Sequence, residues 1–411
     1  MKRILNIEYA AVHGTYWMLY GVVCSFASVF LLGKGYSNSD IGMILAVGNV
    51  VAVFMQPLLA DFADRTKRIS LIGVTEAVTV IIALLTAITF ITQKASIALS
   101  IVFVLMVAWV TALQPLFNSL AFKLEESGHR VNFGAARSMG SLAYSVLCAF
   151  LGTLAQKNGI IVLPITGEIV LVMLLVTLWL TNKHFIKACS KQQADAACSL
   201  DKKIDSSDEI NLVEFIKRNK LFMLVNVGVA GIFFSNAMFN NFMLQIVEGV
   251  GGGSEDMGRI FSLMAFLEIP PMFFFSRVHN RFSCQTLLKF AAICFTAKVV
   301  WVFMAKSVAM IFAAQFFQLV SFGLFLPAMV IFIDEIMEKG EAVKGQALYT
   351  IVITVSTVFA SLLGGFILDI GGAYTLLLIS SVVTGAGTIL FIAIIDKIKK
   401  RNNKDANHLI D

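Results

Sequence analysis

The sequence predicts an all-α membrane protein with twelve transmembrane helices in two six-helix pseudo-symmetric halves. Of its 411 residues, 58% are hydrophobic and only 14% are charged, whereas soluble domains carry about a quarter charged residues. Apolar runs of about 20 residues recur along the chain, and each can cross a hydrocarbon core of about 30 Å. These runs must be helices, because backbone polar groups in lipid need partners within the segment and the two-residue alternation of barrel strands is missing.

Twelve apolar segments follow one another along the chain. We expect these spans at 11–33, 41–60, 70–92, 96–121, 133–155, 160–181, 221–246, 258–276, 284–304, 308–333, 346–368 and 374–395. Basic residues concentrate on the cytoplasmic side of a membrane protein. The termini and the loops on their side hold 24 of the 32 Lys and Arg, the opposite loops hold five when Arg259 at the very start of the eighth span is counted with them, and the remaining three lie inside spans. We therefore expect a multi-pass protein of the plasma (inner) membrane with both termini in the cytoplasm.

A polar stretch between residues 182 and 220 interrupts the apolar pattern, and its composition is typical of a solvated linker. The sequence therefore predicts an N-terminal six-helix bundle at 1–181 and a cytoplasmic linker at 182–220. A C-terminal six-helix bundle is expected at 221–396. The basic tail at 397–411 is expected in the cytoplasm, where it can lie against anionic lipid.

Prolines mark an internal repeat between the two bundles. Pro57 and Pro270 each lie near the end of a span, 213 residues apart, and Pro115 and Pro327 are 212 residues apart. Parallel six-helix repeats place a substrate site between the halves, near the middle of the membrane. Rocking of one half against the other would then expose the site to each side in turn.

Two ionisable residues inside spans are candidates for transport chemistry, because a charge at the bilayer centre costs about 2.5–3.5 kcal/mol or more. Arg137 lies about one turn into the fifth span, and its fork of donors suits hydroxyls or a carboxylate. It could instead reach the headgroups or neutralise Glu126. Glu268 lies in the middle of the eighth span, where it could bind and release one proton per cycle. The alternative for Glu268 is a structural ion pair with Lys298.

Amide side chains that share helix faces form a second group of candidates. Asn236 and Asn240 are one turn apart on the seventh span, Gln315 and Gln318 recur on the tenth, and Asn118 lies on the fourth. Amides and nearby aromatic rings suit a polar, uncharged ligand. The alternative is that these amides hydrogen-bond between helices.

The six cysteines show neither a disulfide framework nor the spacing of a zinc site. We therefore expect no metal and no cofactor.

The turn after the second span resembles the Gly-x-x-x-Asp-Arg loop of the major facilitator superfamily. It reads Ala60-Asp61-Phe-Ala-Asp64-Arg65-Thr-Lys-Arg68, with Ala60 in place of the first glycine. In that family the loop latches the cytoplasmic faces together and releases them during the transport cycle. The resemblance implies a gating role for Asp61, Asp64, Arg65 and Arg68.

A narrower resemblance, to the lactose permease and nucleoside symporter branch of that superfamily, covers most of the chain. The segments that carry it are Gln56-Pro-Leu-Leu, Asn132 to Ser141, Gln315 to Gly323, Gly345-Gln346-Ala-Leu-Tyr and Gly364 to Asp369. Arg137 matches the sugar-binding arginine of lactose permease. Tyr144 falls where that protein stacks a tryptophan on the sugar. The resemblance therefore implies that both residues contact substrate.

The sequence also departs from this branch. Asn118 replaces an expected acidic residue, and Asn236 and Asn240 stand where lactose permease has aspartates. The proton-handling His and Glu of lactose permease align with Phe322 and Phe325. We therefore expect no histidine-based proton relay, which leaves Glu268 as the candidate proton carrier.

Taken with the repeat, these features predict a secondary active transporter, not an enzyme, that takes up a small oligosaccharide or nucleoside together with protons. The residues expected to bind substrate are Arg137, Asn118, Tyr144, Asn236, Asn240, Gln315 and Gln318. The expected partners are a small polar substrate, protons and membrane lipid, with no nucleic acid, and the chain is expected to work as a monomer. Two other functions stay open: proton-antiport export of drugs or metabolites, and a non-transporting membrane sensor.

Overall fold

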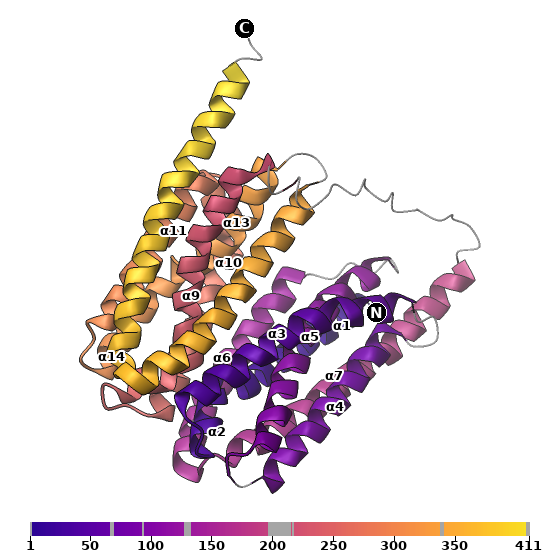
Figure 1. Cartoon of the computed structure of the whole chain (residues 1–411). Helices are drawn as coiled ribbons and strands as arrows, with labels where there is room; N and C mark the ends of the chain where they lie inside the picture. The colour runs from indigo at the N-terminus through magenta and orange to yellow at the C-terminus, as the bar shows by residue number, and fades with distance from the viewer. Residues whose placement is uncertain are drawn as a thin grey trace.

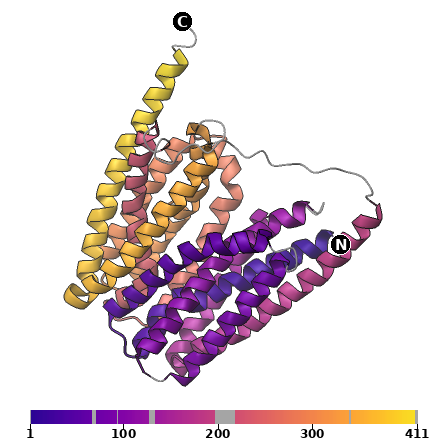
Figure 2. The ribbon, with the colours of Figure 1, turned by 45° about the vertical axis from the view of Figure 1, so that its right-hand side comes forward.

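A computed structural model of the chain describes residues 2–65, 70–92, 94–126, 133–195, 215, 218–337 and 341–407, which are helical apart from short turns. Figures 1 and 2 show two helical bundles, one coloured indigo to magenta and the other rose to yellow. The bundles lie against each other at one end and diverge toward the other. We call the diverging end, where α7 finishes, α9 begins and the C-terminus lies, the linker end, and the opposite one the far end.

The first bundle contains the first six spans. Its elements are α1 (Lys2–Tyr20), η1 (Gly21–Ser25), α2 (Ala27–Gly33), α3 (Asn38–Arg65), α4 (Leu71–Ile91), α5 (Ile97–Glu126), α6 (Phe133–Asn158) and α7 (Val162–Asp195). The first span is not one straight helix. It passes through the π-helical turn η1 and bends by 42° before α2 begins.

The second bundle contains the last six spans. Its elements are α9 (Lys220–Glu248), α10 (Ser254–His279), α11 (Cys284–Phe303), α12 (Val308–Ala314), the 3-10 turn η2 (Gln315–Leu319), α13 (Phe322–Ile336) and α14 (Ala342–Asn407). A straight helix of 66 residues would measure about 100 Å, far more than a bilayer. The helix α14 breaks instead at Gly372, whose φ of 67° and ψ of −174° favour glycine.

These elements account for the predicted crossings. Among the described residues, ten helices are long and apolar enough to cross a membrane, and the bent first span adds an eleventh. The break in α14 divides one of the ten into two limbs. The prediction of an all-α membrane protein is confirmed, and a count of twelve spans agrees with this arrangement.

The outer faces of the helices carry large apolar side chains that no other part of the described chain covers. Phe54, Phe273 and Ile389 are 69%, 73% and 72% exposed. Apolar surface of this extent is unfavourable in water but natural against hydrocarbon tails. These faces therefore form the lipid-contacting surface.

Two helix pairs make the most extensive contacts between the bundles: α3 packs on the first limb of α14, and α6 packs on α10. In the sequence repeat, α3 corresponds to α10 through Pro57 and Pro270, and α6 corresponds to the first limb of α14 through Gly134 and Gly345. The internal repeat therefore exchanges the two contacts, as expected for halves related by a two-fold axis.

Glycines allow the paired helices to approach closely. A β-carbon built on Gly42 of α3 would lie 2.2 Å from the carbonyl oxygen of Ser361 in α14. One built on Gly258 of α10 would lie 2.5 Å from the carbonyl oxygen of Cys148 in α6. Any larger residue at these positions must push backbone away from backbone, so the two seams between the bundles depend on the missing side chains.

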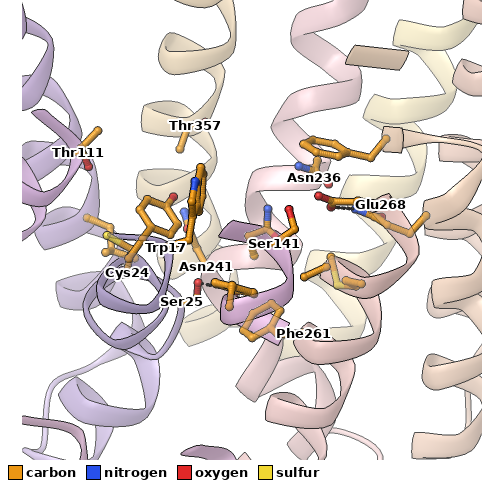
Figure 3. A pocket seen from close by; sticks show the side chains of 18 of the residues that line it. Trp17, Cys24, Ser25, Thr111, Ser141, Asn236, Asn241, Phe261, Glu268 and Thr357 are labelled. Atoms are coloured by element: carbon orange, nitrogen blue, oxygen red, sulfur yellow. Dashed lines mark hydrogen bonds between the residues drawn. The ribbon is translucent and has the colours of Figure 1, made fainter. Parts of the chain in front are cut away.

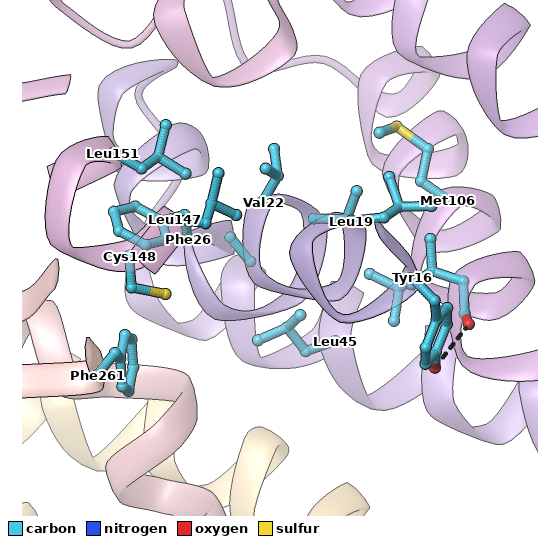
Figure 4. Close-up of a cluster of buried hydrophobic side chains, with 14 of the residues drawn as sticks. Tyr16, Leu19, Val22, Phe26, Leu45, Met106, Leu147, Cys148, Leu151 and Phe261 are labelled. Carbon is cyan, nitrogen blue, oxygen red and sulfur yellow. Dashed lines mark hydrogen bonds between the residues drawn. The ribbon is translucent and has the colours of Figure 1, made fainter. Parts of the chain in front are cut away.

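An apolar cluster lies between the cavity described below and the far end. Figure 4 shows Val22, Phe26, Leu147 and Leu151 of the first bundle around the π-helical turn, with Phe261 of the second bundle next to them. The ring of Phe261 is 6.5 Å from that of Phe26, and both side chains are almost fully buried. Phe261 thus extends the apolar core of the first bundle across to the second.

Candidate functional site

A cavity of about 230 Å³ lies between the bundles. From the first bundle it is lined by Trp17, Tyr20, Cys24, Ser25, Leu45, Asn49, Val107, Thr111, Arg137, Ser141 and Tyr144. From the second bundle it is lined by Asn236, Asn240, Asn241, Phe261, Met264, Ala265, Glu268, Gln318, Phe322 and Thr357. Most of the polar groups are uncharged amides and hydroxyls, and among the described lining residues the formal charges are those of Arg137 and Glu268.

Irregular turns in three spans direct polar groups into the cavity. The π-helical turn η1 supplies Cys24 and Ser25. In α9 the backbone leaves helical geometry at Phe242 (φ −124°, ψ 25°), directly after Asn240 and Asn241. Such breaks change the direction in which neighbouring side chains point, and π-turns in particular occur often at functional sites.

The tenth span contains the third irregular turn. Gln318 lies in η2, a 3-10 turn between α12 and α13. Because a 3-10 turn has three residues per turn rather than 3.6, it changes the face on which the following residues lie. Gln318 therefore lines the cavity, together with Phe322 at the start of α13.

The wall formed by the first bundle holds a guanidinium group against an aromatic ring. Arg137 Cζ lies 4.1 Å from the centre of the Trp17 ring, and Arg137 Nη1 donates a hydrogen bond of 3.2 Å to Ser141 Oγ. Trp17 also packs against Tyr20, with ring centres 5.2 Å apart. A β-carbon on Gly140 would lie only 2.4 Å from Trp17 Cδ1, so this glycine makes room for the indole. The planar cation is thereby fixed at the cavity surface.

The opposite wall carries the carboxylate. Gln318 Nε2 donates a hydrogen bond of 2.8 Å to Glu268 Oε1, and Lys298 Nζ donates one of 2.6 Å to Gln318 Oε1. The predicted alternative of a direct ion pair between Glu268 and Lys298 is therefore replaced by a bridge through one amide. Figure 3 shows Glu268 and Asn236 on one side of the cavity, and Trp17 and Cys24 on the other.

Arg137 and Glu268 belong to different bundles but share the cavity. No ion pair joins them among the described residues, yet they are close enough to interact electrostatically. A change in the separation of the bundles would alter this interaction. The two charges thus face one cavity from opposite bundles.

Other side chains of the cavity are fixed by hydrogen bonds. The hydroxyl group of Tyr144 donates to Ser25 Oγ at 2.8 Å, and Asn241 Nδ2 donates to Ser361 Oγ at 2.7 Å. Ser28 of α2 donates to the backbone carbonyl of Asn241, across the two bundles. These bonds hold the polar surface in place.

Six residues singled out from the sequence meet in this cavity: Arg137, Tyr144, Asn236, Asn240, Gln318 and Glu268. Two others do not line it. Asn118 follows Thr111 on the same helix by seven residues, so it lies about 10 Å nearer the linker end. Gln315 is fully buried in η2 and donates its side-chain amide to the carbonyl group of Ile311, 2.8 Å away.

The expected gating loop is only partly described. Asp61 is exposed near the end of α3, and Asp64 and Arg65 form the last turn of that helix, where only the backbone is described. Arg68 lies outside the described residues. The gating role of these four residues stays a prediction.

Sequence reasoning missed several lining residues. Trp17 precedes Tyr20 by three residues and Cys24 by seven, a spacing that places all three on one helix face. Ser141 lies one turn after Arg137, which could also have identified it. No comparable pattern marks Asn49 or Asn241.

At the far end, the carboxylate of Asp369 in α14 of the second bundle caps α3 of the first bundle. Asp369 accepts hydrogen bonds from the backbone N–H of Asn38 and Ser39, at 3.2 and 2.8 Å, and from both their side chains. Because Asn38 is the first residue of α3, the carboxylate satisfies free N–H groups and faces the positive end of the helix dipole. Gln245 of α9 adds a bond of 2.9 Å to Asn38 Oδ1.

A second contact at the far end joins the other helix pair. Gln156 Oε1 in α6 accepts a hydrogen bond of 2.8 Å from the backbone N–H of Glu255 in α10. Ser254 also donates to the carbonyl group of Gly152 at 3.3 Å. Both seams between the bundles are thus closed at the far end.

Known proteins resemble this chain along almost its whole length. The uncharacterized transporter YwbF of Bacillus subtilis (strain 168) is 24% identical, in an alignment covering 98% of this chain and 96% of that one. The crystal structure of a point mutant of the nucleoside transporter NupG superimposes with a TM-score of 0.74 at 11% identity, covering 95% of this chain and 99% of that one.

A bacterial homologue of the iron transporter ferroportin, crystallised in an inward-facing state, superimposes with a TM-score of 0.68 at 14% identity, covering 96% of this chain and 98% of that one. At such low identity these structures establish the fold alone. The sequence profile described as "MFS_1 like family" matches residues 9–379. The chain therefore belongs to the MFS_1 like family and is a membrane transporter of the major facilitator type.

Proposed function

We propose that the protein imports a small, polar, uncharged solute of the nucleoside or small-oligosaccharide class together with protons. The observation that carries this proposal is the pairing of walls in the cavity between the bundles. One wall presents Arg137 stacked on Trp17, and the other presents Glu268. Amides and hydroxyls line most of the remaining cavity surface.

The lining chemistry supports a neutral ligand with many hydrogen-bonding groups. Amides both donate and accept, and aromatic rings such as Trp17, Tyr20 and Phe322 supply apolar faces for a sugar or a nucleobase. A strongly charged ligand would favour only one of the two charged walls. Among the candidate ligands we place nucleosides first, since the fold is similar to that of the nucleoside transporter NupG.

Glu268 is the proposed proton carrier. A charged carboxylate is costly to enclose when the bundles close over the cavity, whereas a protonated carboxyl group is much less so. The protonated group can also donate a hydrogen bond to a ligand, which the carboxylate cannot. Binding of a proton and of substrate would therefore promote closure together, and this coupling would drive uptake.

The conformation supports alternating access. The cavity lies between bundles that are in contact at the far end and diverge at the linker end (Figure 1). If the linker end is cytoplasmic, as the basic residues predict, this is an inward-open state. The bonds of Asp369 with Asn38 and Ser39 would then break each time the transporter opens outward.

Purified protein in liposomes tests the proposal. Radiolabelled nucleosides, disaccharides and aromatic acids are offered to vesicles with a pH gradient of either sign. The proposal requires that an imposed inward proton gradient drives accumulation of a nucleoside or oligosaccharide inside the vesicles. Accumulation driven only by proton counterflow would indicate an exporter instead, and specific binding without translocation would indicate a sensor.

A further inference from the structure

We propose that His279, Cys284 and Glu335 bind one thiophilic divalent cation, with zinc as the representative ion, at the linker end of the second bundle. The Nδ1 or Nε2 atom of the histidine, the thiol sulfur and a carboxylate oxygen all lie within 4.8 Å of one another. The cluster lies apart from the cavity between the bundles, and it shares no residue with it.

Three different helices supply the donors. His279 is the last residue of α10, Cys284 is the first residue of α11, and Glu335 lies in the last turn of α13. The histidine and the cysteine come from the two ends of one short turn, while the carboxylate arrives from about 50 residues further along the chain. Only the fold brings the third donor to the other two, so spacing in the sequence did not reveal the site.

The spacing of the donor atoms suits tetrahedral coordination. A zinc ion bound at about 2.3 Å from sulfur and about 2.1 Å from nitrogen holds these two atoms about 3.6 Å apart. The distance between Cys284 Sγ and His279 Nδ1 is 3.4 Å. For these two donors a shift of a few tenths of an ångström would admit the ion, and the carboxylate oxygen, which lies within 4.8 Å of both, would move closer by up to about 1 Å. Thiolate, imidazole and carboxylate form a donor set that zinc accepts, and water would fill the fourth position.

Neighbouring residues hold the histidine and the cysteine in place. The ring of His279 is stacked on that of Phe275, with centres 5.9 Å apart and planes only 5° from parallel. Ser283 accepts a hydrogen bond from the backbone N–H of Thr286 and so caps α11 directly before Cys284. Cys284 itself is 1% exposed. Two of the three donors are thus preorganised.

The charge of the cluster also favours a cation. Among the residues that the structure describes, no lysine or arginine pairs with Glu335. A hydrogen bond of the Cys284 thiol with His279 or with Glu335 would explain either contact alone, whereas the convergence of all three donor atoms on one point is what a metal ion requires. A divalent ion neutralises the thiolate and the carboxylate together.

Bound metal would connect helices that carry the proposed coupling residues. Glu268 precedes His279 on α10 by eleven residues, about 16 Å along the helix. Gln318 lies in η2, directly before α13. A cation that fixes the linker ends of α10, α11 and α13 would therefore stabilise the second bundle.

Cobalt(II) binding to the purified full-length protein in nanodiscs tests the site without a transport assay. The wild type should bind one Co²⁺ with a near-ultraviolet thiolate-to-metal band and the visible bands of tetrahedral cobalt, and Zn²⁺ should displace it. Cys284→Ser should abolish the band, and Glu335→Gln should weaken binding at least tenfold. Zn²⁺ should also raise the melting temperature of the wild type but not that of Cys284→Ser.

Cys294→Ser is the matched control, because Cys294 is a second buried thiol on α11. It should leave the cobalt spectrum unchanged. A band that persists in Cys284→Ser, or a wild type without a thiolate band, would overturn the assignment. Should Cys284→Ser fold poorly, Glu335→Gln decides the question, since Glu335 is exposed and its replacement keeps the same shape.

Discussion

Glu268 and Lys298 lie on neighbouring helices and are joined by one amide, that of Gln318, which donates to the carboxylate and accepts from the ammonium group. The lysine is 3% exposed, so its charge has little access to solvent. A buried cation, a bridging amide and a carboxylate at the cavity surface form a linked unit. We therefore expect a change at the carboxylate to affect the lysine through the amide.

Glu268→Gln should abolish accumulation driven by a pH gradient, because the amide cannot take up a proton. Exchange of labelled for unlabelled substrate should continue, since this process needs no net proton movement. Both rates can be measured in liposomes. Glu168→Gln is the control, because Glu168 is a partly buried carboxyl group of the first bundle that does not line the cavity. This variant should keep normal accumulation. Normal accumulation by Glu268→Gln would refute its role as proton carrier.

Lys298→Met should lower the melting temperature, because it leaves a buried amide oxygen without its donor. We expect a cost of about 1–3 kcal/mol. Combining it with Glu268→Gln should recover part of the loss, since no unbalanced charge then remains. A double-mutant cycle on detergent-purified protein measures this coupling, which should be about 0.5–3 kcal/mol. Strictly additive effects would show that Gln318 does not link the two groups.

Arg137→Lys should weaken substrate binding about tenfold or more, although it keeps the positive charge. The ammonium group cannot stack on Trp17 as a planar guanidinium does, and it lacks the fork of donors. Equilibrium binding to the purified protein provides the measurement. Arg259→Lys is the comparison, because Arg259 pairs with Glu255 at the far end. Equal affinities for wild type and Arg137→Lys would exclude the guanidinium from ligand contact.

Asp369→Asn should shift the transporter toward the state that opens at the far end. The carboxylate accepts charge-assisted hydrogen bonds from the first turn of α3, and each is worth about 1.5–3 kcal/mol. Cys24 lines the cavity and can report the change once the other cysteines are replaced. An impermeant thiol reagent added from the far side should label it faster in Asp369→Asn.

Asp256→Asn is the control for this shift, because Asp256 accepts a hydrogen bond from the backbone N–H of Gly253 at the start of its own helix, α10. It should label Cys24 at the wild-type rate. Unchanged labelling in Asp369→Asn would mean that other contacts hold the far end closed.

Gly365→Ala should disturb the seam between α3 and α14, because its β-carbon would lie 2.2 Å from the carbonyl oxygen of Asn38. We expect a lower melting temperature and slower transport. Gly385→Ala lies on the second limb of the same helix, with no atom within 4 Å of an added β-carbon. It should gain up to about 1 kcal/mol of helix propensity. Similar behaviour of the two variants would contradict close packing at the seam.

The sequence predicted the fold well because lipid imposes simple rules. Span length, the excess of basic residues on one side and the spacing of Pro57 from Pro270 do not depend on packing detail. These features led to twelve spans in two related halves. The structure agrees with that architecture and places the break between the last two predicted spans, 346–368 and 374–395, at Gly372.

The cavity was predicted less completely, and the reason is geometric. Helical periodicity paired Gln315 with Gln318, and the 3-10 turn, with three residues per turn, keeps them near one face. Only Gln318 lines the cavity, because the side chain of Gln315 turns back to donate to a backbone carbonyl group of α12. Irregular geometry hid Ser25 and Asn241, which lie in or beside the irregular turns at η1 and Phe242. Regular spacing cannot locate side chains where the helix itself is irregular.

The seams at Gly42 and Gly258 have a consequence for cellular energetics. At Gly42 and Gly258 backbone lies against backbone, so little room is left there for water between the packed helices. Under the proposed proton coupling, such seams would limit proton flow that bypasses Glu268. On the same proposal, a bulkier residue that widens either seam should allow protons to leak without substrate, and so should lower the growth yield of a cell even when transport itself survives.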